Sequence, residues 1–504
     1  MDHQRSPRRF AAAIGALAIA VTACGGTTAT PSPSVAPSVA PSVAASVAPS
    51  VAPSPSVVNI TPAPIAAGPG PNGGVVVRWF IGLGAGTQPA QIGPEQAFIT
   101  AYNASQKDVY IQYEIVDNTQ AANILKTEIA AGNAPDIIGP VGVEGLNLFA
   151  DQLLDLKAQI ASTGYKSTGV DQPLVDFFNS LGQNGATVGL PFAVYPSFLF
   201  YNQALFEEAG LPLPPTKVGD LYQGKPWDLD ALRTLSMKLT VDKAGKDATE
   251  AGFDPNNIVQ WGFDSQYMDN YNARAETAFF GAGPLLSADG KTAVVPDYIA
   301  QGEKWYNDGV WKDHFIPTAA QVASDLLSGG SEFGSGNLAI DEGHTWFTCC
   351  VTPAAPKKPF KFGFAVQPLV NGKITSPLHA DTFSILKTTK VADAAFKALT
   401  AMVASGDLLT AYGAMPADQT KQQAWFDSID KNFPGMKLNW DVAKAMLAYP
   451  DVPNHQSFVP DYAKVRSAMQ AFGNAYRTTS GLDMDAELAK LKTTLQGIFD
   501  AATK

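Results

Sequence analysis

The chain has 504 residues, of which 46% are hydrophobic, which is enough for two or three domains around a large core. Thirty-five Lys and Arg stand against 46 Asp and Glu, so the net charge is -11. A surface of this sign repels nucleic-acid phosphates and anionic lipid headgroups, which argues against a general nucleic-acid binder. Three Cys are too few for a disulfide framework.

Residues 1–23 have the composition of a secretory signal peptide. Three Arg precede an apolar run from Phe10 to Val21, which is too short to span a bilayer. Cys24 follows the small residues Thr22 and Ala23, an arrangement that resembles the bacterial lipobox. The resemblance implies that Cys24 becomes the lipidated first residue of an exported protein on the outer face of the cell membrane. A cleaved signal followed by a chance Cys is the alternative.

Residues 24–74 form an uncharged segment in which Ser, Val, Ala and Pro repeat. The repeat has no periodic apolar face, so we expect a disordered tether that favours the polyproline II conformation. About 50 residues would reach roughly 40 Å as a flexible coil. The tether indicates where the protein works and does not identify its chemistry.

Beyond residue 74 the sequence predicts alternating strands and helices. The β-branched and aromatic run Val75–Leu83 predicts a strand, and apolar residues at helical spacing follow in Gly93–Gln106. The same order recurs in the predicted strand Val109–Val116, the helix Gln120–Ala131 and the strand Pro135–Ile138. Repeated units of this kind indicate a parallel sheet covered by helices. Ligands of such sheets bind beyond the carboxyl ends of the strands.

Six segments, in order, resemble the bacterial extracellular solute-binding proteins of the maltose-binding-protein type. They are AAGNAPDII (Ala130–Ile138), LLDL (Leu153–Leu156), GLPFAVYPSFLFYNQALFEEAGLPLPPT (Gly189–Thr216), FGSGNLAIDEGHTW (Phe333–Trp346), FGFAVQPLVNGK (Phe362–Lys373) and AYGAMPAD (Ala411–Asp418). The resemblance covers the chain from about residue 75 to its end. The chain departs from the family at KVGDLYQGK (Lys217–Lys225), which lengthens one loop.

The resemblance implies an α/β fold of two lobes, each a mainly parallel sheet flanked by helices, joined by hinge strands. We expect residues 75–193 and 369–413 in the N-lobe, and residues 194–368 and 414–504 in the C-lobe. The implied function is capture of a solute, which we expect to be a mono- or oligosaccharide, by hinge closure. A monomer of this kind delivers the solute to an ABC importer permease without a covalent step or a cofactor.

A sugar offers hydroxyl groups and an apolar face, which suit polar and aromatic side chains. Trp346 occupies the position where the resembled family places a sugar-stacking Trp, with a core Trp as the alternative. Asp117 and Asn118 follow the second predicted strand, where they bind ligand or cap a helix. Glu144, after the third strand, is a ligand contact or a solvated acid. Trp79 contacts ligand or is buried in the first strand.

Further ligand contacts are expected in two other regions. Tyr195 lies in a predicted hinge strand and faces either the cleft or the core. Tyr267 and Asp269 form a cleft wall or a capped turn. Asp381 lies where the chain re-enters the first lobe, and the resemblance favours it modestly as a ligand contact over the nearby His379.

Cys349 and Cys350 are adjacent in a chain that we expect to be exported, so a vicinal disulfide and a pair of buried thiols are equally consistent with the sequence. The His residues show no metal-ligand spacing, so we expect no metal site. GLGAG (Gly82–Gly86) lacks the last Gly of a dinucleotide-binding loop, and we discount it.

Three other interpretations stay open. A tethered carbohydrate hydrolase is one, although Asp341 and Glu342 would point to opposite faces of a strand. A sensor or adhesion module with the same fold is another. A cationic solute such as a polyamine is the third, because an acidic cleft would attract it.

Overall fold

The computed structural model describes residues 68–265, 278–328, 331–349, 351 and 360–502. The chain divides into two compact units, residues 1–56 and residues 57–504, and every described residue belongs to the second unit. The expected signal peptide, Cys24 and most of the tether lie outside the described residues.

The predicted alternation of strands and helices is confirmed at the start of the second unit. The elements are β1 (Val75–Ile81), α1 (Pro89–Ser105), β2 (Val109–Ile115), α2 (Asn118–Ala130), β3 (Ile137–Gly142) and α3 (Val143–Leu148). Helix α1 begins at a Pro, which fits the first helical turn because it lacks only an N–H that would have no partner there. Strand β1 pairs in parallel with both β2 and β3.

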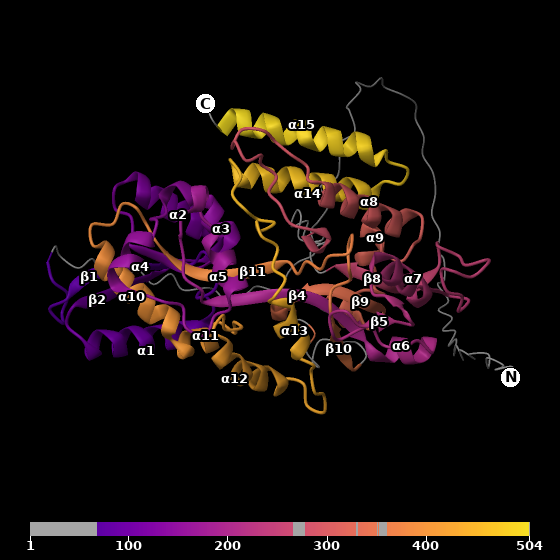
Figure 1. The fold of residues 1–504 in the computed structure, drawn as a ribbon, viewed down its shortest axis with the longest axis horizontal. Helices are drawn as coiled ribbons and strands as arrows, with labels where there is room; N and C mark the ends of the chain where they lie inside the picture. The colour runs from indigo at the N-terminus through magenta and orange to yellow at the C-terminus, as the bar shows by residue number, and fades with distance from the viewer. Residues whose placement is uncertain (1–67, 266–277, 329–330, 350, 352–359, 503–504) are drawn as a thin grey trace, which may run out of the picture. The chain divides into compact units, whose positions relative to one another are not determined.

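Strand β4 (Ala193–Asn202) is the centre of the sheet (Figure 1). Its first half pairs antiparallel with β11 (Leu378–Ile385), and its second half pairs antiparallel with β9 (Leu338–His344). All ten of its residues are buried, which explains why AVYPSFLFYN is nearly continuously apolar instead of alternating. One strand therefore joins two groups of strands.

The sheet runs in the order β2-β1-β3-β11-β4-β9-β8-β7, with β10 (Phe362–Ala365) also paired to β4. Strand β8 (Ile258–Ser265) is parallel to β9 and antiparallel to β7 (Val241–Asp242). The expected α/β fold class is thus confirmed, with parallel strands in each group and antiparallel strands where the groups join.

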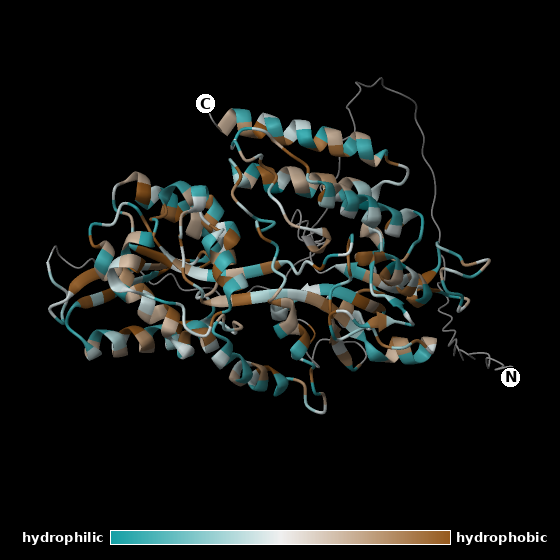
Figure 2. Cartoon of the chain, viewed as in Figure 1, coloured by the Kyte–Doolittle hydropathy of each residue, from teal (hydrophilic) through white to brown (hydrophobic). Residues whose placement is uncertain are grey.

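Helices cover the sheet, and Figure 2 shows hydrophobic and hydrophilic residues interspersed along them. They are α4 (Lys157–Thr163), α5 (Gln172–Asn179), α6 (Gln203–Ala209), α7 (Leu229–Leu239), α8 (Asp297–Trp311), α9 (Ala319–Val322), α10 (Ala392–Ala404), α11 (Gly406–Ala411), α12 (Gln419–Asp430), α13 (Asp441–Met446), α14 (Tyr462–Thr478) and α15 (Met484–Ala502). Of the helices in the described residues, none is long and apolar enough to cross a bilayer.

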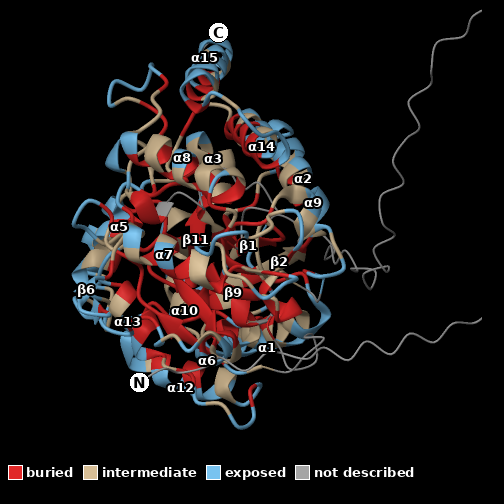
Figure 3. Cartoon of the chain, turned by 90° about the vertical axis from the view of Figure 1, so that its right-hand side faces the viewer, coloured by how far each residue is buried: buried red, intermediate tan, exposed pale blue. Residues whose placement is uncertain are grey.

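Two clusters of buried side chains stabilise the second unit, and Figure 3 shows that burial concentrates on the strands. The smaller cluster joins β1 and β2 to β11 and α10, and it contains Trp79 and Phe383, whose ring centroids lie 5.8 Å apart. The larger cluster surrounds β4, β8 and β9. Burial of this apolar surface is the main free-energy gain of folding.

The loop that departs from the family pattern forms a small hairpin, β5 (Leu221–Tyr222) and β6 (Lys225–Pro226). Tyr222 packs against Trp227 at 5.5 Å, whereas Leu221 is 61% exposed. The extra residues thus form an ordered surface hairpin.

Candidate ligand-binding site

A cavity of about 410 Å³ opens where the loops after β1, β2 and β3 meet β11 and α14. Parallel strands end at one edge of their sheet, so side chains that are distant in sequence converge there. The lining residues are Leu83, Gly84, Asn118, Ala122, Gly142, Val143, Glu144, Gly145, Leu148, His379, Asp381, Gln456 and Arg466. Asn118, Glu144 and Asp381 were expected from the sequence, and the structure brings these three together.

Two of these side chains are held by protein partners. The Asn118 amide donates to the carbonyl oxygens of Gly82, at 3.0 Å, and Gly84, at 3.4 Å, and so ties the loop after β1 to the start of α2. The Glu144 carboxylate, at the start of α3, accepts a hydrogen bond from the Arg466 guanidinium of α14 and forms an ion pair with it. The one cation that lines the cavity is therefore paired with one of its two acids.

Asp381 is the second acid of the cavity. Its Oδ2 atom accepts a 3.1 Å hydrogen bond from the hydroxyl of Tyr195, which is only 8% exposed. Burial raises the pKa of Asp381 to about 6, and the hydrogen bond from Tyr195 opposes part of that rise. Tyr195 thus lies behind the site, where it supports Asp381.

Trp346 packs into a group of aromatic rings beside the cavity. Its indole stacks on the imidazole of His344, with centroids 4.4 Å apart and planes 4° apart. The rings of Tyr195, at 5.0 Å, and His379, at 4.9 Å, meet it edge to face. These contacts hold a half-buried Trp in one orientation, as a stacking platform requires.

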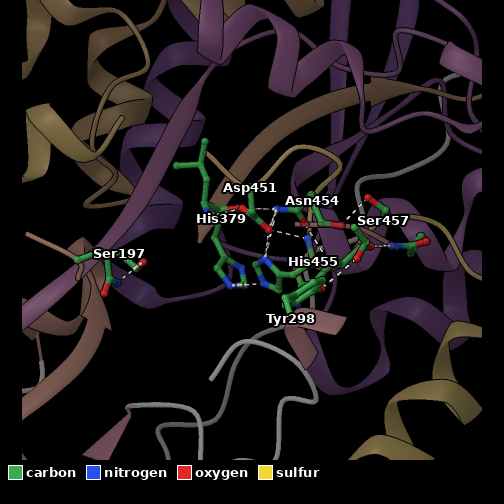
Figure 4. A network of polar contacts seen from close by, with 12 residues as sticks. Ser197, Tyr298, His379, Asp451, Asn454, His455 and Ser457 are labelled. Carbon is green, nitrogen blue, oxygen red and sulfur yellow. Dashed lines mark hydrogen bonds and ion pairs between the residues drawn. The ribbon is translucent and has the colours of Figure 1, made fainter. Parts of the chain in front are cut away.

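His379 lines the cavity, and the sequence analysis passed it over in favour of Asp381. The two residues are two positions apart in β11, so their side chains leave the same face of the sheet. That period would have identified His379 from sequence once Asp381 was accepted. Its Nε2 atom lies 3.2 Å from Nε2 of His455, whose Nδ1 lies 2.7 Å from Oδ2 of the buried Asp451 (Figure 4).

The imidazoles at this site favour the neutral form. Burial, together with mutual repulsion of positive charge, lowers the pKa values of His344 and His379 well below the usual range. Within the part of the chain that the structure describes, no group of three or more His, Cys, Asp or Glu is arranged to hold a metal ion. The site can therefore accept hydrogen bonds and stack on an apolar ring face.

The structure corrects one expected ligand contact. Trp79 has no exposed surface, and its indole N–H donates a 2.7 Å hydrogen bond to the carbonyl oxygen of Gly139. It is a core residue, because β1 is covered by helices on both faces. Asp117 is the N-cap of α2 and accepts from the backbone N–H of Thr119 at 2.9 Å.

Other expectations fall elsewhere. Tyr267, Asp269 and Cys350 lie outside the described residues, and with Cys350 the question of a vicinal disulfide to Cys349. The acid pair considered for a hydrolase is buried inside β9, where Glu342 accepts hydrogen bonds from two neutral side chains, Ser265 and Gln367. Neither acid lines the cavity.

The fold and the cavity together define a two-lobe solute-binding protein of the periplasmic-binding-protein type. Residues 97–415 match the family model of bacterial extracellular solute-binding proteins, and the chain belongs to this family. Membership implies that the protein is exported. A comparison with curated proteins found no match.

Solved structures of similar fold include UspC of M. tuberculosis, with a TM-score of 0.64 and 21% identity over 85% of this chain and 100% of UspC. The cyclic α-maltosyl-1,6-maltose binding protein of Arthrobacter globiformis has a TM-score of 0.61 and 18% identity over 85% and 100% of the two chains. The sugar-binding protein MalE of Xanthomonas citri has a TM-score of 0.61 and 16% identity over 85% and 98%. At these identities the likeness establishes the fold.

Proposed function

We propose that this protein captures a mono- or oligosaccharide by hinge closure and delivers it to an ABC importer permease. The observation that carries the proposal is the platform of Trp346, held beside a cavity that Asp381 and His379 line. Sugar hydroxyls donate to carboxylate and imidazole acceptors, and the apolar face of a sugar ring covers an indole. The neighbours that bind maltose-type sugars support the same ligand class.

The charge of the cavity favours a neutral ligand over a polyamine. Arg466 pairs with Glu144, which leaves Asp381 as the one acid of the described lining without a cationic partner there. With a pKa of about 6, Asp381 supplies at most one negative charge at neutral pH. A polyamine carries several positive charges, and each needs an acidic or carbonyl partner when it leaves water.

Hinge closure is supported by the way β4 divides its partners. We propose that residues 75–193 and 369–413 form the N-lobe, and residues 194–368 and 414–504 the C-lobe. On this division β4 leaves its pairing with β11 of one lobe and enters its pairing with β9 of the other. The Glu144–Arg466 ion pair would then join the lobes at the cavity. A ligand that contacts both lobes favours the closed state.

The same proposal includes the anchor and the partners. Cys24 carries the lipid, the segment 24–74 is the tether, and a monomeric body presents its ligand to the permease. The small residues before Cys24 and the uncharged repeat after it support the anchor. Two or more acyl chains are needed for firm anchoring, because a single chain binds membranes only marginally.

The test is a binding screen of the full chain by intrinsic Trp fluorescence and melting temperature, with product analysis alongside. The panel holds glucose, maltose, maltotriose, spermidine and glutamine. We expect a saturable fluorescence change with sugars and a rise in melting temperature, because a ligand of the folded state alone stabilises it. Saturation by spermidine or glutamine alone, silence across the panel, or release of glucose from maltose would each contradict the proposal.

A further inference from the structure

The buried carboxylate of Asp451 is surrounded by N–H donors. Its Oδ1 atom accepts from the backbone N–H of Leu378 at 2.8 Å, and its Oδ2 atom accepts from the backbone N–H of His455 at 2.6 Å. The side-chain amide of Asn454 lies 3.2 Å from Oδ1. Backbone N–H groups can only donate, so both oxygens of Asp451 act as acceptors. The same carboxylate thereby holds the strand residue that precedes His379.

This arrangement decides which ring nitrogen of His455 carries a proton. Nδ1 of His455 lies 2.7 Å from Oδ2 of Asp451, and a carboxylate can only accept, so Nδ1 must be the donor. In the neutral ring the lone pair is then on Nε2. His455 is 1% exposed, which favours the neutral form.

The constraint passes on to His379. Nε2 of His455 and Nε2 of His379 lie 3.2 Å apart, so one must donate and the other accept. With the lone pair on Nε2 of His455, His379 donates from Nε2. Its own lone pair is then on Nδ1, which makes that atom an acceptor.

The groups packed around His379 come from four other elements. His344 of β9 meets it edge to face at 4.6 Å, Trp346 at 4.9 Å and His455 at 4.8 Å. Tyr195 is its partner in the pairing of β4 and β11, and Asp381 follows two residues later on the same face. Packing on these sides holds the ring in place, and the chain from Asp451 selects its tautomer.

We infer that Asp451 and His455 are positioning residues that fix His379 of the ligand site as the Nε2–H tautomer, so that Nδ1 of His379 accepts a hydrogen bond from a ligand hydroxyl. The inference rests on the proposed function for the identity of the ligand, and on the hydrogen bonds alone for the tautomer. It adds a second acceptor beside Asp381 and gives roles to two residues that do not stack on the ligand.

The first experiment measures the tautomers without a ligand. Long-range proton–nitrogen NMR spectra of the full chain, labelled with ¹⁵N in its five His, distinguish the two neutral forms and the imidazolium. Signals are assigned from H379Q and H455Q. We expect Nδ1–H for His455 and Nε2–H for His379. An imidazolium at position 455, or Nδ1–H at position 379, would overturn the inference.

The second experiment tests the consequence for binding with maltose as the probe. H455Q keeps an acceptor near the position of Nε2, whereas H455F keeps a ring and removes the acceptor. We expect H455F to weaken maltose binding about 5- to 10-fold, as loss of one oriented hydrogen bond does, and to mix the tautomers of His379. H455Q should stay within about 2-fold of the unmodified chain.

H314N is the matched control, because His314 stacks on Phe253 far from the cavity lining and has a positive φ of 59° that Asn tolerates. It should bind as the unmodified chain does. Equal losses in H455Q and H455F would show that His455 acts only through packing. If the tautomers are as expected and no sugar binds, the proposed function fails while the tautomer assignment stands.

Discussion

The hydroxyl of Tyr195 on β4 reaches diagonally across the antiparallel pair to the carboxylate of Asp381 on β11. Tyr195 lies directly opposite His379, so its 3.1 Å hydrogen bond goes to the residue two positions further along. One buried Tyr on the strand shared by both strand groups thereby supports the acid that lines the cavity.

The first prediction concerns the pH dependence of ligand affinity. A charged carboxylate accepts hydrogen bonds better than a protonated one, so sugar affinity should be highest above pH 6 and fall as Asp381 is protonated below it. The hydrogen bond from Tyr195 lowers the pKa of Asp381, so Y195F should move the midpoint of this profile above 6. Calorimetric titration with sugar between pH 5 and 8 measures the midpoint.

D381N and Y110F complete that experiment. D381N has no titrating group at this position and should bind more weakly with a flat profile. Y110F removes a hydroxyl from β2, outside the cavity lining, and should keep the midpoint near 6. A midpoint that stays in place in Y195F would show that another group governs the profile.

A second prediction concerns Glu95, whose carboxyl has no exposed surface and accepts a 2.8 Å hydrogen bond from the hydroxyl of Tyr412. Burial raises the pKa of Glu95 from 4.5 to about 8. Between these values the folded state keeps a proton that the unfolded state releases. The free energy of unfolding therefore falls as pH rises, by up to about 1.4 kcal/mol per pH unit from this group.

E95Q removes that contribution, so its stability relative to the unmodified chain should increase from pH 5 to pH 8. Urea unfolding at pH 5, 6.5 and 8 measures the difference. E207Q changes an exposed acid of α6 and should preserve the original slope. An unchanged slope in E95Q would mean that Glu95 is already ionised in the folded state.

The third prediction concerns the ion pair between Glu144 of α3 and Arg466 of α14. Side chains that are 31% and 39% exposed form a pair worth about 0.2–1 kcal/mol. If this pair joins the lobes, R466M should shift the unliganded chain toward the open state by up to about 5-fold. Small-angle X-ray scattering should then give a larger radius of gyration.

The exchanged pair, E144R with R466E, is the control for that shift, because it restores opposite charges at the same two positions. It should return the radius of gyration to the original value at low salt. A radius that R466M leaves unchanged would indicate that the pair does not hold the lobes together.

The fourth prediction separates two Trp residues by the same substitution. W79L removes a core indole and leaves the buried carbonyl of Gly139 without its donor, so it should lower the free energy of unfolding by about 2–4 kcal/mol. Sugar affinity should not change while the protein is folded. W346L should instead weaken sugar binding by about 2- to 10-fold, because it removes the stacking face. Denaturant unfolding and calorimetry measure the two effects.

The fifth prediction concerns the anchor. C24S cannot be acylated, so the exported protein should move from the membrane fraction to the soluble extracellular or periplasmic fraction. C349S, which leaves the lipobox intact, is the control and should stay with the membrane. Intact mass of the mature protein gives the second readout, and a protein without added acyl mass would contradict the lipidation proposal.

Much of the fold could be predicted because its signals are local. The run Val75–Leu83 contains β1, and Val109–Val116 contains β2, because β-branched and aromatic residues favour extended backbone wherever they cluster. The segment after each strand was expected to carry polar ligand contacts, and Asn118 and Glu144 indeed line one cavity. Strand order and edge follow from the repeated β–α units, so this convergence needs no contact information.

The sequence alone therefore determined the family, the alternation of elements and the edge of the sheet where a site forms. Only the tertiary structure decided which side chains face the cavity. Strands buried on both faces show no alternation, so Trp79 and Tyr195 gave no sign of their direction. His379 and His455 are 76 residues apart, and their hydrogen bond exists because β11 packs against the segment after α13. Such contacts depend on packing between distant segments, and no local pattern records them.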